Sequence, residues 1–250
     1  MPRFLSDYLQ LFVSVWVLVA TTDVNCISAE RPSLPQTGAL GPQAGAMIPC
    51  PKWRSLFNGK DLSDWEVSLF GGDGEIRTEG KQVEIGFGLP MSGLRYQGKI
   101  PTLDYEIRLE AKRVSGSDFF CGLTFPVRKS HCSLIVGGWG GSVVGLSNID
   151  GMDASQNETT QYLSLKSDQW YRIQIRVTAQ KIEVWLDDKQ IINQDIRQQQ
   201  ISLRNEMFPT RPLGLATWQT AAAVRNLEIQ SLQNEKCKVQ SAKCKVKSGE

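Results

Sequence analysis

The sequence predicts an all-β domain in which two antiparallel sheets pack as a sandwich or jelly roll, and three observations support this. Short runs of alternating apolar and polar residues recur along the middle of the chain. No segment keeps the three-four apolar period of an amphipathic helix, and 22 glycines supply many turns. Short strands at such close spacing are typical of sandwiches and barrels.

The two ends of the chain differ from its middle in composition. Residues 11–20 form an apolar run that is too short for a membrane span, and Ala29 suits a cleavage site, so 1–29 is interpreted as a signal peptide. An uncleaved N-terminal anchor is the alternative. Residues 30–52 are rich in Pro and Gly and are predicted to be a flexible linker. We therefore expect an exported protein, periplasmic, in the cell envelope or extracellular, with no membrane span after cleavage.

The globular domain is predicted at 53–232, followed by a tail at 233–250 that repeats a Lys-Cys-Lys-Val unit. One large apolar residue per repeat cannot form a coiled-coil seam, so the tail is predicted to be disordered. A net charge of +2 gives no strong field for nucleic acid. The oligomeric state stays open.

Each predicted strand follows from local patterning. Asn58-Gly59 predicts a turn that leads Trp65 into the first strand, and Asp187-Asp188 predicts a tight hairpin turn. Strict alternation in 224–229 places Val224 on one face and Leu227 on the other. The remaining predicted strands are 82–85, 104–111, 119–125, 132–136, 142–147, 170–178, 181–186 and 190–194.

Export permits disulfide bonds, and cleavage after Ala29 leaves five cysteines, Cys50, Cys121, Cys132, Cys237 and Cys244. Cys121 and Cys132 flank a predicted hairpin and are the best candidate pair. Two buried free thiols, packing as small apolar groups, are the alternative.

Residues 56–65, 169–188 and 214–227 together resemble the 3-keto-disaccharide hydrolase family. The resemblance covers 53–232, and residues 117–126 are similar to a planctomycete-type branch of that family. It implies a concanavalin A-like β-sandwich in an exported bacterial protein. It also implies carbohydrate chemistry, in which a sugar oxidised at C3 is cleaved by elimination and then hydrated.

The chain departs from the family pattern at positions that carry chemistry. Residues 121–126 lack an Arg that many relatives have, and residues 131–138 lack an acidic residue. These departures favour a non-catalytic, lectin-like carbohydrate-binding module as the alternative function. The Lys/Cys tail suggests a third reading, a structural or adhesive envelope protein.

Asp118 and His131 are the candidate acid and base groups. Asp118 precedes an apolar strand, where a carboxylate among aromatic residues suits acid–base chemistry, although Asp is also frequent in turns. His131 is the single histidine and suits neutral pH, yet a lone His at a loop edge is often a surface residue.

Four further residues are candidates for binding the sugar. Trp139 lies among four glycines and Trp218 ends the segment 212–218, and either indole is a sugar platform or a core residue. Arg211 is a candidate for binding hydroxyls or an oxyanion. Asn148 opens the polar run 148–157 and is the fourth candidate.

No cofactor is certain from the sequence. Asp150, Asp153 and Asn157 are candidate oxygen ligands for Ca²⁺ or another divalent metal, although their spacing is not that of an EF-hand loop. A simple polar loop is the alternative.

Overall fold

The computed structural model describes residues 52–232 of the chain. The predicted signal peptide, nearly all of the linker and the tail lie outside the described residues, as do Cys50, Cys237 and Cys244. In the described part no helix has the length and apolarity needed to cross a membrane.

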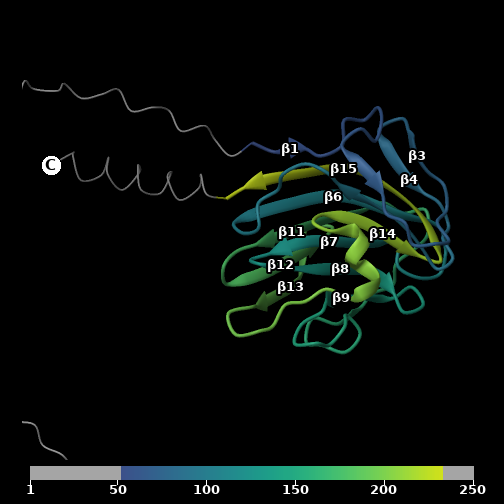
Figure 1. The fold of residues 1–250 in the computed structure, drawn as a ribbon. Helices are drawn as coiled ribbons and strands as arrows, with labels where there is room; N and C mark the ends of the chain where they lie inside the picture. The colour runs from purple at the N-terminus through teal and green to yellow at the C-terminus, as the bar shows by residue number, and fades with distance from the viewer. Residues whose placement is uncertain (1–51, 233–250) are drawn as a thin grey trace, which may run out of the picture. The chain divides into compact units, whose positions relative to one another are not determined.

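Two antiparallel sheets form the domain, which confirms the predicted sandwich (Figure 1). Sheet A has the order β13-β12-β11-β6-β15-β4-β3, and β1 pairs with β15. Its strands are β1 (Arg54–Ser55), β3 (Ile76–Glu79), β4 (Gln82–Ile85), β6 (Tyr105–Gly116), β11 (Tyr171–Val177), β12 (Lys181–Leu186), β13 (Lys189–Asp195) and β15 (Thr220–Ser231).

Sheet B has the order β10-β9-β8-β7-β14-β5-β2. Its strands are β2 (Trp65–Val67), β5 (Met91–Tyr96), β7 (Cys121–Val127), β8 (Ser130–Gly138), β9 (Val143–Ser147), β10 (Gln161–Tyr162) and β14 (Gly214–Trp218). The 3-10 helix η1 (Asn205–Thr210) precedes β14, and its ribbon crosses in front of sheet B in Figure 1.

Apolar side chains from the inner faces of both sheets make the main core. Tyr105, Phe120 and Phe125 are among its largest fully buried members. The alternation predicted for 104–111 and 170–178 is confirmed, because β6 and β11 bury every second side chain. The predicted turn at Asp187-Asp188 is also confirmed, since both residues have positive φ, as a type I′ hairpin requires.

The strict alternation predicted for 224–229 is wrong because β15 contains a β-bulge. The register with β6 shifts between Arg225 and Glu228, and Asn226 has φ 53°. This extra residue turns Leu227 inward, so Val224 and Leu227 are both buried instead of lying on opposite faces. Asn226 is exposed and donates to Glu110.

The loop before β2 delivers Trp65 into the core as predicted. The side-chain oxygen of Asn58 accepts from the backbone N–H groups of Lys60 and Asp61, which fixes the turn. Hydrogen bonds from Asn58 and Ser63 lower the pKa of Asp61 to about 2. Trp65 Nε1 then donates to Leu56 O over 2.8 Å.

Cys121 and Cys132 are free, buried thiols, so the disulfide alternative is wrong. The hairpin register explains this, because Cys121 lies opposite Val136 whereas Cys132 lies opposite Phe125. The second alternative, two small apolar groups in the core, is confirmed.

The outer face of sheet B is largely covered by other segments. A second apolar cluster there includes Ile135, Ala154 and Met207. Thr210 anchors η1, since its Oγ1 lies 2.7 Å from Thr124 Oγ1 and 2.6 Å from Met207 O. Thr124 Oγ1 in turn lies 2.9 Å from Ser133 Oγ. A line of buried hydroxyl groups therefore joins η1 to β7 and β8.

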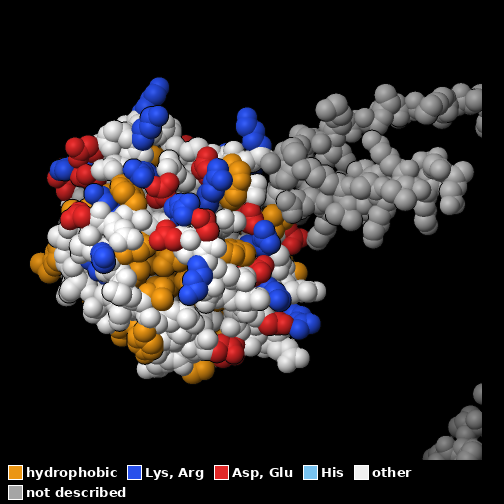
Figure 2. All heavy atoms as spheres, turned by 180° about the vertical axis from the view of Figure 1, so that it is seen from behind, with side chains coloured by type: hydrophobic (Ala, Val, Ile, Leu, Met, Phe, Trp, Pro, Cys, Tyr) orange, Lys and Arg blue, Asp and Glu red, His pale blue; other side chains and the backbone are white. Residues whose placement is uncertain are grey.

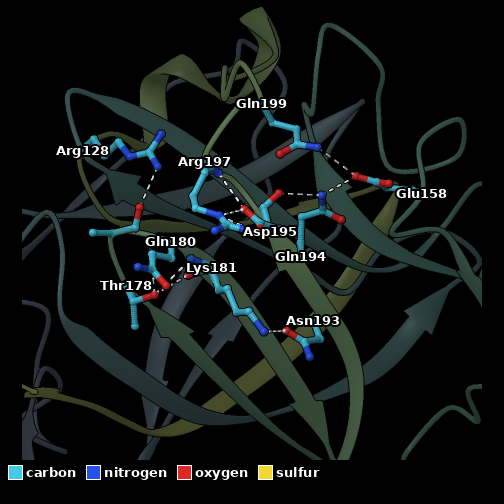
Figure 3. A network of polar contacts seen from close by, with 11 residues as sticks. Arg128, Glu158, Thr178, Gln180, Lys181, Asn193, Gln194, Asp195, Arg197 and Gln199 are labelled. Atoms are coloured by element: carbon cyan, nitrogen blue, oxygen red, sulfur yellow. Dashed lines mark hydrogen bonds and ion pairs between the residues drawn. The ribbon is translucent and has the colours of Figure 1, made fainter.

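Polar contacts hold the free edge of sheet A to the loops of sheet B (Figure 3). Gln194 of β13 donates to Glu158, and Gln199 donates to the same carboxylate oxygen over 3.4 Å. Arg197 pairs with Asp195, and this pairing lowers the pKa of Asp195 to about 2. The outermost strand of sheet A is thus tied to the loop that covers sheet B.

The outer face of sheet A is an exposed, charged surface. Arg108 pairs with Glu228, and Arg225 pairs with Glu110. Figure 2, which shows the molecule from behind, has basic and acidic side chains intermixed over the visible face. Because these charges are paired with one another, they supply no net field of one sign.

Replacing Thr210 with Val is expected to lower the free energy of unfolding by about 1–3 kcal/mol, because the buried hydroxyl of Thr124 and the Met207 carbonyl each lose a partner. Urea unfolding measures the loss. Thr102→Val, at an exposed position, is the control. Equal losses in the two variants would contradict the role of the hydroxyl line.

Stability should fall with rising pH above about 9. Burial raises the pKa of both Cys121 and Cys132 from 9.0 to about 12, so between these values the unfolded chain releases protons that the folded chain keeps. The free energy of unfolding then declines by about 1.4 kcal/mol per pH unit for each thiol. Burial also raises the pKa of Tyr105 well above 10, which adds a further decline at higher pH.

Urea unfolding curves recorded between pH 8 and 11 measure this slope, to which each thiol contributes the release of about one proton. Replacing both cysteines with Ala should lower stability near pH 8, where each change leaves a small cavity, and should flatten the slope above pH 9. An unchanged slope in the double variant would show that other groups cause the pH dependence.

Candidate functional site

A cleft of about 240 Å³ opens at the end of sheet B where β7 begins and where β8 and β14 end. Six apolar side chains line most of it, namely Met91, Phe119, Ile135, Trp139, Met207 and Trp218. Three charged side chains, Asp118, Arg204 and Glu206, complete the lining. The cleft is therefore an aromatic pocket with a few convergent polar groups, which is the usual character of a small-ligand site.

Three of the residues singled out from the sequence meet in this cleft. Asp118 comes from the loop before β7, Trp139 from the turn between β8 and β9, and Trp218 from the end of β14. Because β7 pairs antiparallel with both β8 and β14, the start of β7 lies beside the ends of the other two strands, and the three segments meet at the same end of the sheet.

The carboxylate of Asp118 is held by its own loop and by the neighbouring turn. Its Oδ1 accepts from the Phe119 N–H over 2.7 Å, and its Oδ2 accepts from the Gly140 N–H over 3.1 Å. Its backbone N–H donates to Thr220 Oγ1. Because a carboxylate oxygen can accept more than one hydrogen bond, both oxygens keep capacity for a ligand.

Trp139 is presented on a tight turn. Its φ is 48°, and Gly137, Gly140 and Gly141 also have positive φ, a conformation that glycine adopts without strain. The side chain is 42% exposed, which is unusual for so large an aromatic residue. Of the two alternatives for Trp139, the structure favours an accessible indole over a core residue.

Trp218 combines both of its predicted roles. Its ring centroid lies 6.4 Å from that of Phe119, and it packs against the second apolar cluster. Its backbone N–H donates to Phe119 O. The half-buried indole therefore stiffens the cleft and still contributes to the wall.

Sequence reasoning missed Arg204 and Glu206. Arg204 precedes η1 and donates to Asp153 Oδ2 over 3.0 Å and to Glu206 Oε1 over 2.9 Å. The hydrogen bond between them raises the pKa of Arg204 and lowers that of Glu206, so both are charged at neutral pH. The only feature of the sequence that could have indicated these two residues is that they form a charged pair close to Met207, in a segment without the alternation of a strand.

His131 and Arg211 lie away from the cleft. His131 is near the start of β8, whereas the cleft is at its end, and it shares a separate shallow pocket with Lys99 and Pro212. Burial, and then the charge of Arg211, lower the pKa of His131. Arg211 stacks over the Phe208 ring at 4.4 Å. The structure therefore does not bring either residue to Asp118.

Asn148 is also outside the cleft lining. Its backbone N–H donates to Ser202 O over 2.8 Å, and its Oδ1 accepts from Ser147 Oγ. These contacts fix the start of the loop that covers sheet B.

The predicted oxygen ligands for a metal are engaged in building that loop. Asp150 accepts from the Gln200 N–H, Asp153 accepts from Ser155 and Arg204, and the Asn157 oxygen accepts from Thr159. Within residues 52–232 no three His, Cys, Asp or Glu side chains are grouped to hold a metal ion. As arranged, these residues do not fit a calcium site.

Two indoles beside two carboxylates and a guanidinium are suited to polyhydroxylated ligands. Indole faces accept the C–H faces of a sugar ring, while charged groups bind its hydroxyls. A ring in this cleft would also lie within reach of the Asp118 carboxylate, which can accept a proton.

Similar solved structures share the two-sheet fold at low identity. The Crh5 transglycosylase in complex with NAG has TM-score 0.51 at 11% identity, over 74% of this chain and 85% of that chain. A carbohydrate binding module from Bacillus subtilis has TM-score 0.47 at 16% identity, over 68% and 97% of the two chains. Domain 4 of an extracellular arabinanase from Geobacillus stearothermophilus has TM-score 0.45 at 15% identity, over 68% and 87%.

The likeness to the Crh5 transglycosylase shows the fold alone, and no curated protein matches the chain. The pattern of the 3-keto-alpha-glucoside-1,2-lyase-like domain matches residues 52–230, almost the whole described part. The chain therefore belongs to this family of carbohydrate-active domains, as the resemblance of its strand patterns predicts.

Proposed function

We propose that the domain binds a saccharide in the cleft and cleaves 3-keto-glycosides by elimination followed by addition of water. One observation carries the proposal, namely that Trp139, Trp218 and the Asp118 carboxylate line one cleft in a domain of this family. We also propose that the protein is exported, from the pattern of residues 1–29.

The proposed chemistry needs one base and one group that stabilises an anion. A ketone at C3 acidifies the C2 proton, which Asp118 removes, and the electron pair moves onto the C3 oxygen as an enolate. The enolate expels the C1 substituent and breaks the glycosidic bond. The carboxylic acid formed at Asp118 then protonates the leaving oxygen, and water adds across the new C1–C2 double bond.

The charged pair in the cleft has a place in this scheme. Arg204 carries a permanent positive charge in the cleft lining, where it stabilises the developing enolate. Its ion pair with Glu206 and Asp153 holds the guanidinium in one orientation. Arg204 thus supplies, from a different segment, the positive group that 121–126 lacks.

A cleft of about 240 Å³ holds less than a drug-sized ligand, for which about 300–1,000 Å³ is usual. We infer that one sugar ring enters between the indoles while the remainder of the substrate lies outside. This arrangement places a single glycosidic bond at the cleft mouth.

A non-catalytic binding module is the second candidate, and one observation favours it. The stretches 121–126 and 131–138, which lack the Arg and the acidic residue that many relatives have, belong to β7 and β8, and η1 contacts this face through Thr124. In this second candidate function, the cleft binds a sugar and does not catalyse its cleavage.

Asp118→Asn is expected to lower kcat on 3-ketosucrose or 3-ketotrehalose by at least about a hundredfold with KM changed only a few-fold, because the base is lost while the indoles remain. Product release by the purified mature chain, with and without added divalent metal, is the measurement. Asp188→Asn, on an exposed turn of sheet A, is the matched control.

If the wild-type chain releases no product under any of these conditions, the proposal that the protein is an enzyme is wrong. Calorimetric titration with the same sugars then decides the second candidate. Binding that is lost in Trp139→Ala but kept in Asp118→Asn would establish a binding module, and no binding at all would remove both.

A further inference from the structure

Arg113 is a buried arginine of β6 that has no carboxylate in ion-pair contact among the described residues. It is 5% exposed, and its guanidinium lies 5.1 Å from the Phe120 ring centroid. Its hydrogen-bond partners are backbone carbonyl groups, and its Nε is buried without a partner. A buried charge held in this way is costly, and an apolar side chain of similar shape would normally fill a core as well or better.

The carbonyl groups that Arg113 binds bracket the turn that carries Trp139. Its Nη2 donates to Gly141 O over 3.1 Å and to Gly137 O over 3.4 Å. Its Nη1 donates to Leu165 O over 3.1 Å, in the segment that follows β10. One guanidinium therefore joins both ends of the turn to β6 and to a third segment.

The glycines of the turn leave the space that the guanidinium needs. A Cβ at Gly137 would lie 2.6 Å from Arg113 Nη2, and a Cβ at Gly141 would lie 3.3 Å from it. A Cβ at Gly140, in contrast, would meet no atom within 4 Å. Glycine at 137 is thus required by contact with Arg113 as well as by its positive φ.

The charge of Arg113 also acts on the other side of the turn. Burial lowers the pKa of Arg113, whereas electrostatic interactions with Tyr171 and with the Asp118 carboxylate raise it. Asp118 binds the Gly140 N–H, so the turn is held from one side by a cation at its carbonyl groups and from the other by an anion at an N–H group.

We propose that Arg113 is a positioning residue for the cleft, which holds Trp139 and the Gly140 N–H in the arrangement that a saccharide meets. This inference rests on the proposed function, because it concerns how the same cleft binds a sugar ring. A bound sugar would meet an indole whose position is already fixed, which reduces the ordering cost of binding.

The first arm of the test needs no ligand. In Arg113→Met, amide hydrogen exchange at Gly140 should be about tenfold faster, the effect of losing a hydrogen bond to a charged group, while amides of β11 exchange as before. Arg113→Lys keeps the positive charge but loses the paired N–H groups of the guanidinium, so its exchange rate at Gly140 should lie between those of the wild type and Arg113→Met. Arg108→Met, on the outer face of the same strand, is the matched control and should leave Gly140 unchanged.

The second arm measures binding of 3-ketotrehalose by calorimetry. Arg113→Met is expected to weaken affinity about tenfold, with partial rescue in Arg113→Lys and no change in Arg108→Met. If Arg113→Met does not fold, Gly137→Ala displaces the guanidinium but keeps its charge. Gly151→Ala, outside the cleft lining, is its matched control, since φ is 81° at Gly137 and 79° at Gly151 and a Cβ at Gly151 would meet no atom within 4 Å.

Exchange at Gly140 that rises no more than in the β11 amides, or an equal effect of the two glycine variants, would overturn the proposal. So would unchanged affinity in Arg113→Met when the wild type binds. If the wild-type chain binds no saccharide, the proposed function fails, and the exchange arm alone still decides whether Arg113 positions the turn.

Discussion

The cleft depends on the close approach of other segments to the outer face of sheet B. A Cβ at Gly122 would lie 2.9 Å from the Phe119 ring and 3.2 Å from the Met207 side chain. A Cβ at Gly145 would lie 2.7 Å from the Ala154 carbonyl oxygen. Larger side chains at these positions would lift η1 and the covering loop off the sheet, because packed segments cannot share that space. The walls made by Met207 and Glu206 would move with them.

This packing also decides where chemistry can take place. The middle of the outer face is closed by η1 and the covering loop, so polar groups on β7 and β8 are buried and bind one another. Only the rim where these strands end presents Asp118 and the two indoles to a ligand. Thr124 of β7 and Ser133 of β8, which lie in this covered region, are not part of the cleft lining. The residues that line the cleft instead come from the flanking loops and the strand ends.

The sequence predicted the features that depend on local patterning. Alternation in β6 and β11 is a two-residue period set by burial, and the Asp187-Asp188 turn is set by backbone preference. The bulge at Asn226 was missed, because it depends on pairing with β6 rather than on the residues of β15 alone.

Within the site, Trp139, Trp218 and Asp118 could be found because their residue types are unusual in their segments. Arg204 and Arg113 could not, since what distinguishes them is a set of partners distant in the chain. Arg204 contacts a carboxylate 51 positions away, and Arg113 binds carbonyl groups 24 to 52 positions away. An arginine in an alternating strand is ordinarily read as a solvated residue, and only the structure shows that this one is buried.

The Trp139 turn shows why such long-range contacts matter for recognition. A tryptophan with φ 48° is in a sparsely populated conformation, which persists only where the surroundings determine it. Here Asp118 fixes an N–H group of the turn and Arg113 fixes its carbonyl groups. Both side chains hold the backbone of the turn, and the Trp139 indole lies exposed on it. Under the proposed function, a sugar ring stacked on the indole would meet a preorganised apolar face in a cleft that also holds the Asp118 carboxylate, and preorganisation of this kind is what binding and proton transfer require.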